Sequence, residues 1–407
     1  MNSNFTSNFF AGNRSRLREL FPGAAPIVIT AAGLLQKSAD TTYKFSQDRD
    51  FWYLTGINHP DFIFVMDRNR EYIIAPDRND FNNVFNGEID YAELTSISGI
   101  EQILDEKQGW KQLGSKIKRS GHVAVISPAP AHIKLHGFYT NPAKSSLLTK
   151  IKDINPGIDL LDLRSAMTRL RSIKQPIEVD TIQKSVDLTV KTFKVLNKNA
   201  QKYKYEREFV AEASRNFLRE GADHAYDPIV AAGSRACILH NTSGSGEISS
   251  GDMVLLDIGA EIEYYAADIT RVIAPSGMSK RQRSVVDAVV ESRDFAFSLL
   301  KPGIMSRDYE SRMEHFVGEQ LRKLGLIKTI EHEAVRKYFP HATSHMLGLD
   351  VHDKSDYERP LESQMVLTVE PGIYIPEEGI GVRIEDDVLI TNDGIQVLSN
   401  NLPAVLE

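Results

Sequence analysis

Cysteine is almost absent from this chain, since Cys237 is the only one among 407 residues. A single cysteine excludes an intrachain disulfide and any metal site built from several thiolates. If the protein binds a metal ion, carboxylate oxygens and imidazole nitrogens must therefore hold it.

Long apolar runs and an excess of basic residues are also missing. No run reaches the roughly 18 residues needed to cross a bilayer, and residues 1–20 lack the apolar segment of a secretory signal. The 48 basic residues are outnumbered by 55 acidic ones, for a net charge of −7, which leaves no basic footprint for nucleic acid or an anionic membrane. We expect a cytoplasmic protein with neither of these partners.

The length and composition predict two or three globular domains, because 42% of the residues are apolar and 25% are charged. Residues 25–160 alternate short apolar runs with turn-rich and helical pieces, as in an α/β domain. Pro176 then stands where a helix can begin. We predict an N-terminal domain at 1–170 and a second domain at 171–407.

The second domain combines helical and strand patterns. Amphipathic helices are predicted at 177–196, 206–220, 280–300 and 307–325. Strands are predicted at 253–262, 264–274, 365–375 and 381–391. Because the strands come in adjacent pairs, the expected fold is α+β, built on antiparallel hairpins.

Each predicted hairpin carries two acidic residues among apolar ones. In a hairpin, the residue numbers of each opposed pair add up to the same value. A turn between Ile262 and Glu263 therefore places Asp257 opposite Asp268. A turn between Glu377 and Glu378 likewise places Glu370 opposite Glu385. Opposed side chains lie about 4.5 to 5.5 Å apart at Cβ, where like charges destabilise a sheet unless a positive group lies between them.

Four such carboxylates carry a charge of −4, which two divalent metal ions would balance, whereas leaving them buried without partners would cost several kcal/mol each. A neutral ligand is available from His341, His345 or His352. This ligand set suits Mn²⁺, Co²⁺ or Fe²⁺, with Zn²⁺ as a further alternative. Two such ions can hold a bridging hydroxide as a nucleophile, which is the centre of a hydrolase.

Simpler interpretations exist for each residue taken alone. A single acid such as Asp257 could be a solvated strand-edge residue, and His240 could be a hydrogen-bonded structural histidine. Residues His341 and His345 could merely share one face of a helix. In the first domain, His122, His132 and His136 are interpreted as structural. The joint pattern of four acids and nearby histidines favours the metal site.

Five segments together resemble one known family. "ILHNTS", "LLDIGAEIEYYAADITR", "HATSHMLGLDVHD", "VLTVEPGIYI" and "GIGVRIEDDVLIT" resemble the motifs of the pita-bread metallopeptidases, especially the aminopeptidase P group, in order and spacing. "KSADTTYKFSQDRDFWYLTG" is similar to the N-terminal domain of that group, so the resemblance covers residues 11–400. Methionine aminopeptidases share the catalytic fold but usually lack such a domain.

The resemblance implies a role for each matching residue. The metal ligands would be Asp257, Asp268, His345, Glu370 and Glu385, with Glu370 also moving the proton of the bridging water. His240 and His352 would orient the substrate and stabilise the tetrahedral intermediate. His341 would line the leaving-group side, and Arg383 would support the acids at the edge of the substrate site.

The chain departs from the family pattern at two places. Ala342 follows His341 where the family usually has glycine, and the loop between Glu370 and Glu385 is shorter than in some members. The extra methyl group restricts the backbone beside the cleft. Both departures concern peptide specificity rather than metal binding.

The expected function is hydrolysis of the bond between an N-terminal residue and proline, in peptides with proline at position two, by an enzyme with two divalent ions and Mn²⁺ as the leading candidate. This bond is a tertiary amide without an N–H. The alternatives are a Xaa-Pro dipeptidase and a pita-bread peptide-binding protein without catalysis. Creatinase-like relatives lack the metal ligands, so the five acids and histidines here favour an enzyme. The resemblance also implies a homodimer or homotetramer.

Overall fold

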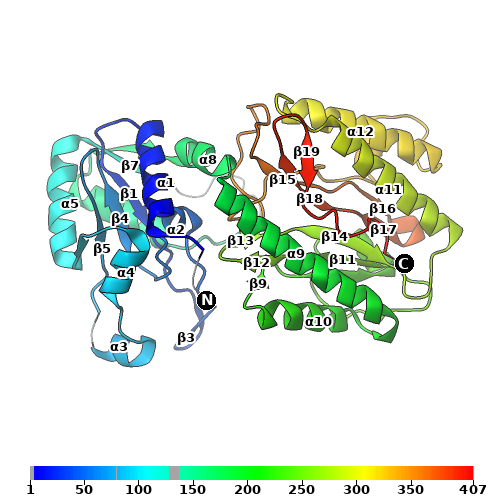
Figure 1. Cartoon of the computed structure of the whole chain (residues 1–407), viewed down its shortest axis with the longest axis horizontal. Helices are drawn as coiled ribbons and strands as arrows, with labels where there is room; N and C mark the ends of the chain where they lie inside the picture. The colour runs from blue at the N-terminus through cyan, green and yellow to red at the C-terminus, as the bar shows by residue number, and fades with distance from the viewer. Residues whose placement is uncertain (1–3, 79, 128–136, 407) are drawn as a thin grey trace. The chain divides into compact units, whose positions relative to one another are not determined.

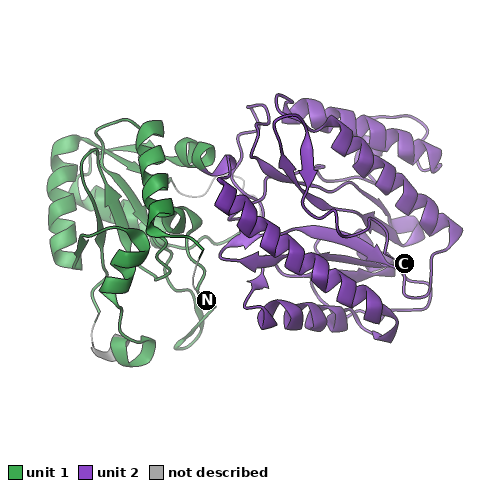
Figure 2. Cartoon of the chain, viewed as in Figure 1, with its two compact units in different colours: residues 1–170 green, residues 171–407 purple. Residues whose placement is uncertain are grey.

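The computed structural model describes residues 4–78, 80–127 and 137–406. Contacts along the chain divide it into two compact units, Met1–Leu170 and Arg171–Glu407 (Figure 2). Of the three first-domain histidines interpreted as structural, His122 lies 3.3 Å from Asp159 Oδ2 through its Nδ1 atom, whereas His132 and His136 lie outside the described residues.

Unit 1 is an α/β domain, as the sequence predicts. Its six-stranded mixed sheet has the order β6-β5-β4-β1-β7-β8, and α5 and α7 lie beside it (Figure 1). Apolar side chains of the sheet and of these two helices form one core cluster. The helices are α1 (Ser7–Leu20), α2 (Arg49–Thr55), α3 (Asp80–Asn86), α4 (Tyr91–Ser98), α5 (Glu106–Ser120), α7 (Ala143–Ile154) and α8 (Arg164–Ser172), the last of which runs into unit 2. The strands are β1 (Ile27–Thr30), β2 (Gln36–Ser38), β3 (Thr41–Thr42), β4 (Ile63–Met66), β5 (Glu71–Ile74), β6 (Ile103–Leu104), β7 (His122–Val125) and β8 (Asp159–Asp162).

The helices of unit 2 confirm the four predicted helical segments. Pro176 occupies the first turn of α9, and the Glu178 carboxylate accepts a hydrogen bond from the Gln175 backbone N–H at 2.9 Å, which satisfies a donor at the helix start. The helices are α9 (Pro176–Asn199), α10 (Glu206–Arg219), α11 (Lys280–Leu299), α12 (Ser306–Lys323) and α13 (His332–Arg336), with short 3₁₀ turns η1 (Ala200–Lys202), η2 (Gly233–Cys237) and η3 (Pro376–Glu378).

The strands of unit 2 lie between these helices. Helices α9 and α10 pack on strands β10, β12 and β13, while α11 packs on β15, β16 and β17 and contacts α12 (Figure 1). The strands are β9 (Asp223–His224), β10 (Ile229–Ala232), β11 (Val254–Ile258), β12 (Ala260–Ile262), β13 (Tyr265–Ala266), β14 (Ile269–Ile273), β15 (Val366–Val369), β16 (Gly372–Ile375), β17 (Ile380–Arg383), β18 (Asp386–Ile390) and β19 (Ile395–Val397). All strand pairs among them are antiparallel.

The predicted register of the first hairpin is wrong by one residue on each strand. Asp257 faces Thr270 rather than Asp268. The turn is centred on Glu263 and Tyr264, which have φ angles of 48° and 71°, as a tight two-residue hairpin turn requires. The composition of this turn could not distinguish the two registers, because both centres fall within the short segment 261–264.

The register of the second hairpin is confirmed. Val369 pairs with Asp386 on one side, and Gly372 pairs with Arg383 on the other, so Glu370 and Glu385 occupy opposed positions. Both lie where the strands are interrupted, between β15 and β16 and between β17 and β18. Because these two residues lie outside the strands, their side chains do not have to follow the alternation between the two faces of a sheet.

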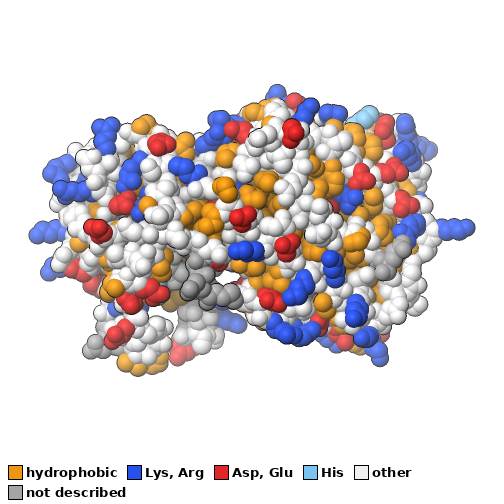
Figure 3. All heavy atoms as spheres, viewed as in Figure 1, with side chains coloured by type: hydrophobic (Ala, Val, Ile, Leu, Met, Phe, Trp, Pro, Cys, Tyr) orange, Lys and Arg blue, Asp and Glu red, His pale blue; other side chains and the backbone are white. Residues whose placement is uncertain are grey.

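The surface shows no bias toward one charge on the face in Figure 3, where basic and acidic side chains are interspersed over the described residues. None of the helices in the described part of the chain has the length and apolar composition needed to span a bilayer.

Candidate active site

All nine predicted site residues line or border one pocket in unit 2. The pocket has a volume of about 350 Å³ and lies at the interruptions of the two hairpins. The side chains that meet there are Asp257, Asp268, Glu370, Glu385, His240, His341, His345, His352 and Arg383. The structure therefore brings together residues that are up to 145 positions apart, from His240 to Glu385.

Asp257 and Asp268 are held together by a residue that sequence analysis missed. The Tyr226 hydroxyl lies 2.5 Å from Asp257 Oδ1 and 2.6 Å from Asp268 Oδ1, and each aspartate is 6% exposed. Burial and the two carboxylates raise the pKa of Tyr226 above its usual value, so it is a phenol that donates one proton between the two acids. Its partners' second oxygens remain available for other contacts.

We expect Tyr226→Phe to weaken divalent metal binding by roughly 10- to 100-fold, the usual cost of losing an outer hydrogen bond that orients metal ligands. The ring remains, so the fold should persist. Titration of the metal-free protein with Mn²⁺, followed by calorimetry, measures the change. Tyr139→Phe, at a fully exposed tyrosine, is the matched control. An unchanged dissociation constant in Tyr226→Phe would contradict an orienting role for the hydroxyl.

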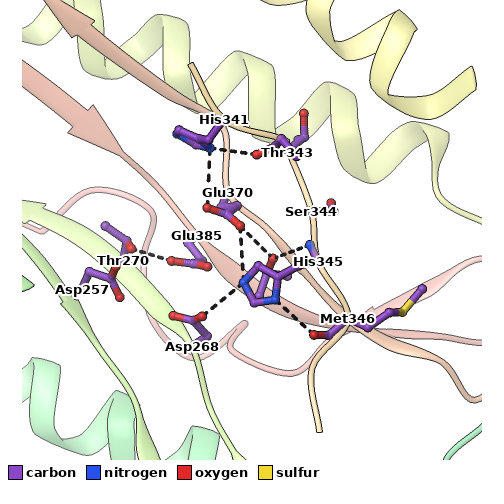
Figure 4. A network of polar contacts seen from close by, with 12 residues as sticks. Asp257, Asp268, Thr270, His341, Thr343, Ser344, His345, Met346, Glu370 and Glu385 are labelled. Carbon is purple, nitrogen blue, oxygen red and sulfur yellow. Dashed lines mark hydrogen bonds and ion pairs between the residues drawn. The ribbon is translucent and has the colours of Figure 1, made fainter. Parts of the chain in front are cut away.

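Glu385 is oriented by the residue that faces Asp257 across the first hairpin. Thr270 Oγ1 donates a hydrogen bond to Glu385 Oε2 at 2.5 Å (Figure 4). The Arg383 guanidinium donates to Thr270 Oγ1 at 3.0 Å and to Asp257 Oδ2 at 2.5 Å. Arg383 therefore pairs with one carboxylate and contacts the side chain that holds a second one.

His345 points its Nε2 atom toward two carboxylates. The distances are 3.4 Å to Asp268 Oδ2 and 3.5 Å to Glu370 Oε1 (Figure 4). Its Nδ1 atom lies 3.1 Å from the Met346 carbonyl oxygen, which accepts the proton of a neutral imidazole. The Nε2 lone pair is then free to bind a metal ion between the carboxylates.

Burial disfavours the ionised forms of three of the four carboxylates. Burial raises the pKa of Asp257 to about 6 and that of Glu370 to about 7, and it raises the pKa of Glu385 well above its usual value. Burial would lower the pKa of His345, but the Asp268 and Glu370 carboxylates outweigh it and raise this pKa to about 9. Bound divalent cations would favour the deprotonated forms of these groups.

The donor atoms fit a divalent metal ion. One ligand atom each from Asp268, His345 and Glu385 lies within 4.8 Å of the others. Asp257 and Glu370 line the same pocket and add two further carboxylates. Oxygen donors with one imidazole suit borderline and hard divalent ions, and no thiolate competes in the pocket.

The remaining histidines border the pocket, and His341 Nδ1 lies 3.7 Å from Glu370 Oε2. The His341 Nε2 atom lies 2.9 Å from the Tyr374 hydroxyl, and burial lowers the pKa of His341 to about 3. The His352 ring packs edge-on at 4.2 Å from the His345 ring, and burial lowers the pKa of His352. His240 follows η2 and is exposed. His240 and His352 line the same pocket, whereas both ring nitrogens of His341 already contact other groups, the Ala342 carbonyl oxygen at 2.8 Å and the Tyr374 hydroxyl at 2.9 Å.

Several supporting residues escaped the sequence analysis. Besides Tyr226, these are Thr270, Tyr374 and Thr368, whose Oγ1 donates to Glu370 Oε1 at 3.2 Å. The period-two alternation of a strand places Thr270 on the same face as Asp268 and Thr368 on the same face as Glu370, so this signal could have found both. No sequence pattern identified Tyr226, because it lies outside the two hairpins.

The two departures from the family pattern occupy the border of the pocket. Ala342 lines it and is not among the non-glycine residues with positive φ, so the backbone there tolerates a side chain. The loop between Glu370 and Glu385 forms the hairpin β16 and β17, closed by η3.

Family models match both units of the chain. Residues 180–392 match the model described as metallopeptidase family M24. Residues 10–125 match the model described as the aminopeptidase P N-terminal domain.

Curated relatives and solved structures resemble the chain along its whole length. Human Xaa-Pro aminopeptidase 3 is 32% identical over 93% of this chain and 78% of its own. Escherichia coli Xaa-Pro aminopeptidase is 31% identical over 94% of this chain and 92% of its own. The structure of zinc-substituted E. coli aminopeptidase P in complex with product superimposes with a TM-score of 0.88 at 28% identity, covering 98% of this chain and 96% of that one.

Proposed function

Because this chain belongs to metallopeptidase family M24, we propose that it is a Xaa-Pro aminopeptidase, which hydrolyses the bond between an N-terminal residue and a penultimate proline. The observation that carries the proposal is the convergence of four carboxylates and one imidazole in a single pocket. Relatives with this activity in their names match both the catalytic unit and the N-terminal unit.

We propose that two divalent ions bind per chain, with Mn²⁺ as the leading candidate and Co²⁺, Fe²⁺ or Zn²⁺ as alternatives. The ligands are Asp257, Asp268, His345, Glu370 and Glu385. When bound, the ions activate a water molecule as the nucleophile and polarise the substrate carbonyl group. Bound cations would also favour the ionised forms of Asp257 and Glu370, whose pKa values are raised mainly by burial.

The protein's own groups handle the proton and the developing charge. Glu370 Oε1 accepts a hydrogen bond from Thr368, and Glu370 Oε2 lies 3.7 Å from His341 Nδ1. Glu370 therefore has a fixed orientation in which it can take a proton from the attacking water and return it to the leaving nitrogen. His352 is neutral at pH 7 because burial lowers its pKa, so one ring nitrogen can donate to an oxyanion without a competing charge.

His341 is assigned to the leaving-group side of the scissile bond. Its ring packs between Phe339 and Tyr374, at centroid distances of 5.0 and 5.5 Å. His341 itself lines the pocket, whereas Phe339 and Tyr374 are buried and are not among its lining residues. His240, on the exposed border of the pocket, is assigned to substrate orientation. A homodimer or homotetramer remains part of the proposal, as the family resemblance implies.

Peptide length separates an aminopeptidase from a dipeptidase. We expect Ala-Pro-Ala to be cleaved faster than Ala-Pro, with kcat/KM compared on one matched series and Ala-Ala-Ala as the proline control. A dipeptide preference of about tenfold or more, about 1.4 kcal/mol in transition-state binding, would assign the chain to the Xaa-Pro dipeptidases. Equal cleavage of Ala-Ala-Ala would remove the proline specificity.

A further inference from the structure

A second pocket opens beside the metal-site pocket in unit 2. Its volume is about 440 Å³, against about 350 Å³ for the first. The two pockets share four lining residues, Ala342, Ser344, His345 and Tyr357. A substrate in the first pocket is therefore a direct neighbour of the second.

The walls of the second pocket are apolar. Met346, Leu361 and Leu367 are 5, 4 and 3% exposed and belong to the main apolar core of the unit. The buried Tyr309 side chain adds an aromatic wall, and its hydroxyl already has a partner, because it lies 3.0 Å from Ser344 Oγ. Such a surface favours an uncharged apolar group over a polar one.

The charged side chains around this pocket are already hydrogen-bonded or exposed to water, so a charged ligand is not needed to balance them. The two carboxylate oxygens of Glu310 accept hydrogen bonds from the Thr343 backbone N–H at 3.1 and 3.0 Å. Arg307 and Glu358 are exposed at the border, where water solvates them. The interior of the pocket therefore suits an aliphatic or aromatic side chain.

We propose that this pocket binds the apolar side chain of the residue that follows proline in the substrate, an inference that rests on the proposed function. Ala342 and Ser344 line both pockets and follow His341, which is assigned to the leaving-group side. The pocket therefore continues the site in the direction of the departing peptide. Among peptides Xaa-Pro-Yaa, the enzyme selects those in which Yaa is apolar and large.

The first test compares three substrates of the wild-type enzyme loaded with Mn²⁺. We expect kcat/KM for Ala-Pro-Leu-amide and Ala-Pro-Phe-amide to exceed that for Ala-Pro-Gly-amide by roughly 10- to 100-fold, the usual effect of burying such a side chain. Amidation removes the terminal carboxylate, so the ratio reports the Yaa side chain alone.

The second test narrows the pocket. Ser306, at the start of α12, lines this pocket and not the first one. Ser306→Trp should reduce the leucine-to-glycine ratio at least fivefold, while Ser298→Trp at an exposed site on α11 should preserve it. If circular dichroism shows that Ser306→Trp does not fold, Ser306→Leu replaces it with the same expected direction.

Three results would overturn the proposal. Equal kcat/KM for the glycine, leucine and phenylalanine amides would show that no Yaa pocket exists, although Xaa-Pro cleavage itself would stand. A leucine preference that survives in folded Ser306→Trp would place the selection elsewhere. A third result would assign the pocket to the N-terminal residue. In this result Ser306→Trp abolishes a preference for an apolar Xaa among Xaa-Pro-Gly-amides but leaves the preference for an apolar Yaa unchanged. If the enzyme cleaves no Xaa-Pro peptide at all, the proposed function is overturned, and this inference with it.

Discussion

Glu385→Ala is expected to empty the metal site and abolish hydrolysis of Ala-Pro-Ala. Glu385 is 2% exposed, and its ligand atom lies with those of Asp268 and His345 within 4.8 Å. Loss of a direct ligand should weaken metal binding by more than the roughly 10- to 100-fold caused by loss of an outer hydrogen bond. Asp268→Ala should have the same effect. Elemental analysis of Mn²⁺-loaded protein, paired with an activity assay, makes the measurement.

The second hairpin offers its own control for this experiment. Glu377 lies in η3 with a side chain 52% exposed, so Glu377→Ala removes a carboxylate from the same hairpin outside the pocket. It should retain metal and activity. Wild-type protein that holds fewer than about one ion per chain, with activity unaffected by a chelator, would refute the metal-dependent hydrolase mechanism.

His352→Ala is expected to lower kcat by roughly 10²- to 10⁴-fold, the range for loss of a proton-transfer or oxyanion-stabilising group. The His352 ring packs edge-on against the His345 ring, at a centroid distance of 4.2 Å, and it is not among the residues whose ligand atoms cluster in the described structure. Metal content should therefore stay close to that of the wild type. Steady-state kinetics on Ala-Pro-Ala and elemental analysis of the same preparation separate the two effects. His240→Ala should lower kcat in the same direction.

An exposed histidine on α12 provides the comparison for this variant. His315 has a side chain 67% exposed, so His315→Ala should preserve both kcat and metal content. Loss of metal from His352→Ala would reassign His352 to the ligand shell. An unchanged kcat in His352→Ala would show that His352 takes no part in the reaction.

The amino-acid pattern alone predicted the four long helices and the two acid-bearing hairpins of unit 2. Four amphipathic segments became α9, α10, α11 and α12, because their apolar residues recur at helical spacing. The sums of residue numbers located the Glu370 and Glu385 pair correctly. The count of buried negative charges was sufficient to predict metal ions, since charge balance does not depend on the register.

The first hairpin shows what local pattern leaves open. The predicted and observed registers differ by a slip of two residues between the strands. Because side chains alternate with a period of two, this slip keeps every apolar residue on its own face, and hydrophobic alternation does not oppose it. The tertiary structure selected the observed register, with Asp257 opposite Thr270. Gly259 permits the close approach that follows, because a Cβ atom there would lie 1.8 Å from the Ala267 carbonyl oxygen.

The sequence by itself determined which side chains can hold metal ions, because carboxylate and imidazole are the only strong ligands that this chain has in quantity. Only the tertiary structure decided how these ligands are oriented. The Tyr226 hydroxyl joins Asp257 to Asp268, and Thr270 ties Glu385 to Arg383. These contacts join residues that are 31 to 115 positions apart, so packing of distant segments creates them, and no local periodicity encodes them.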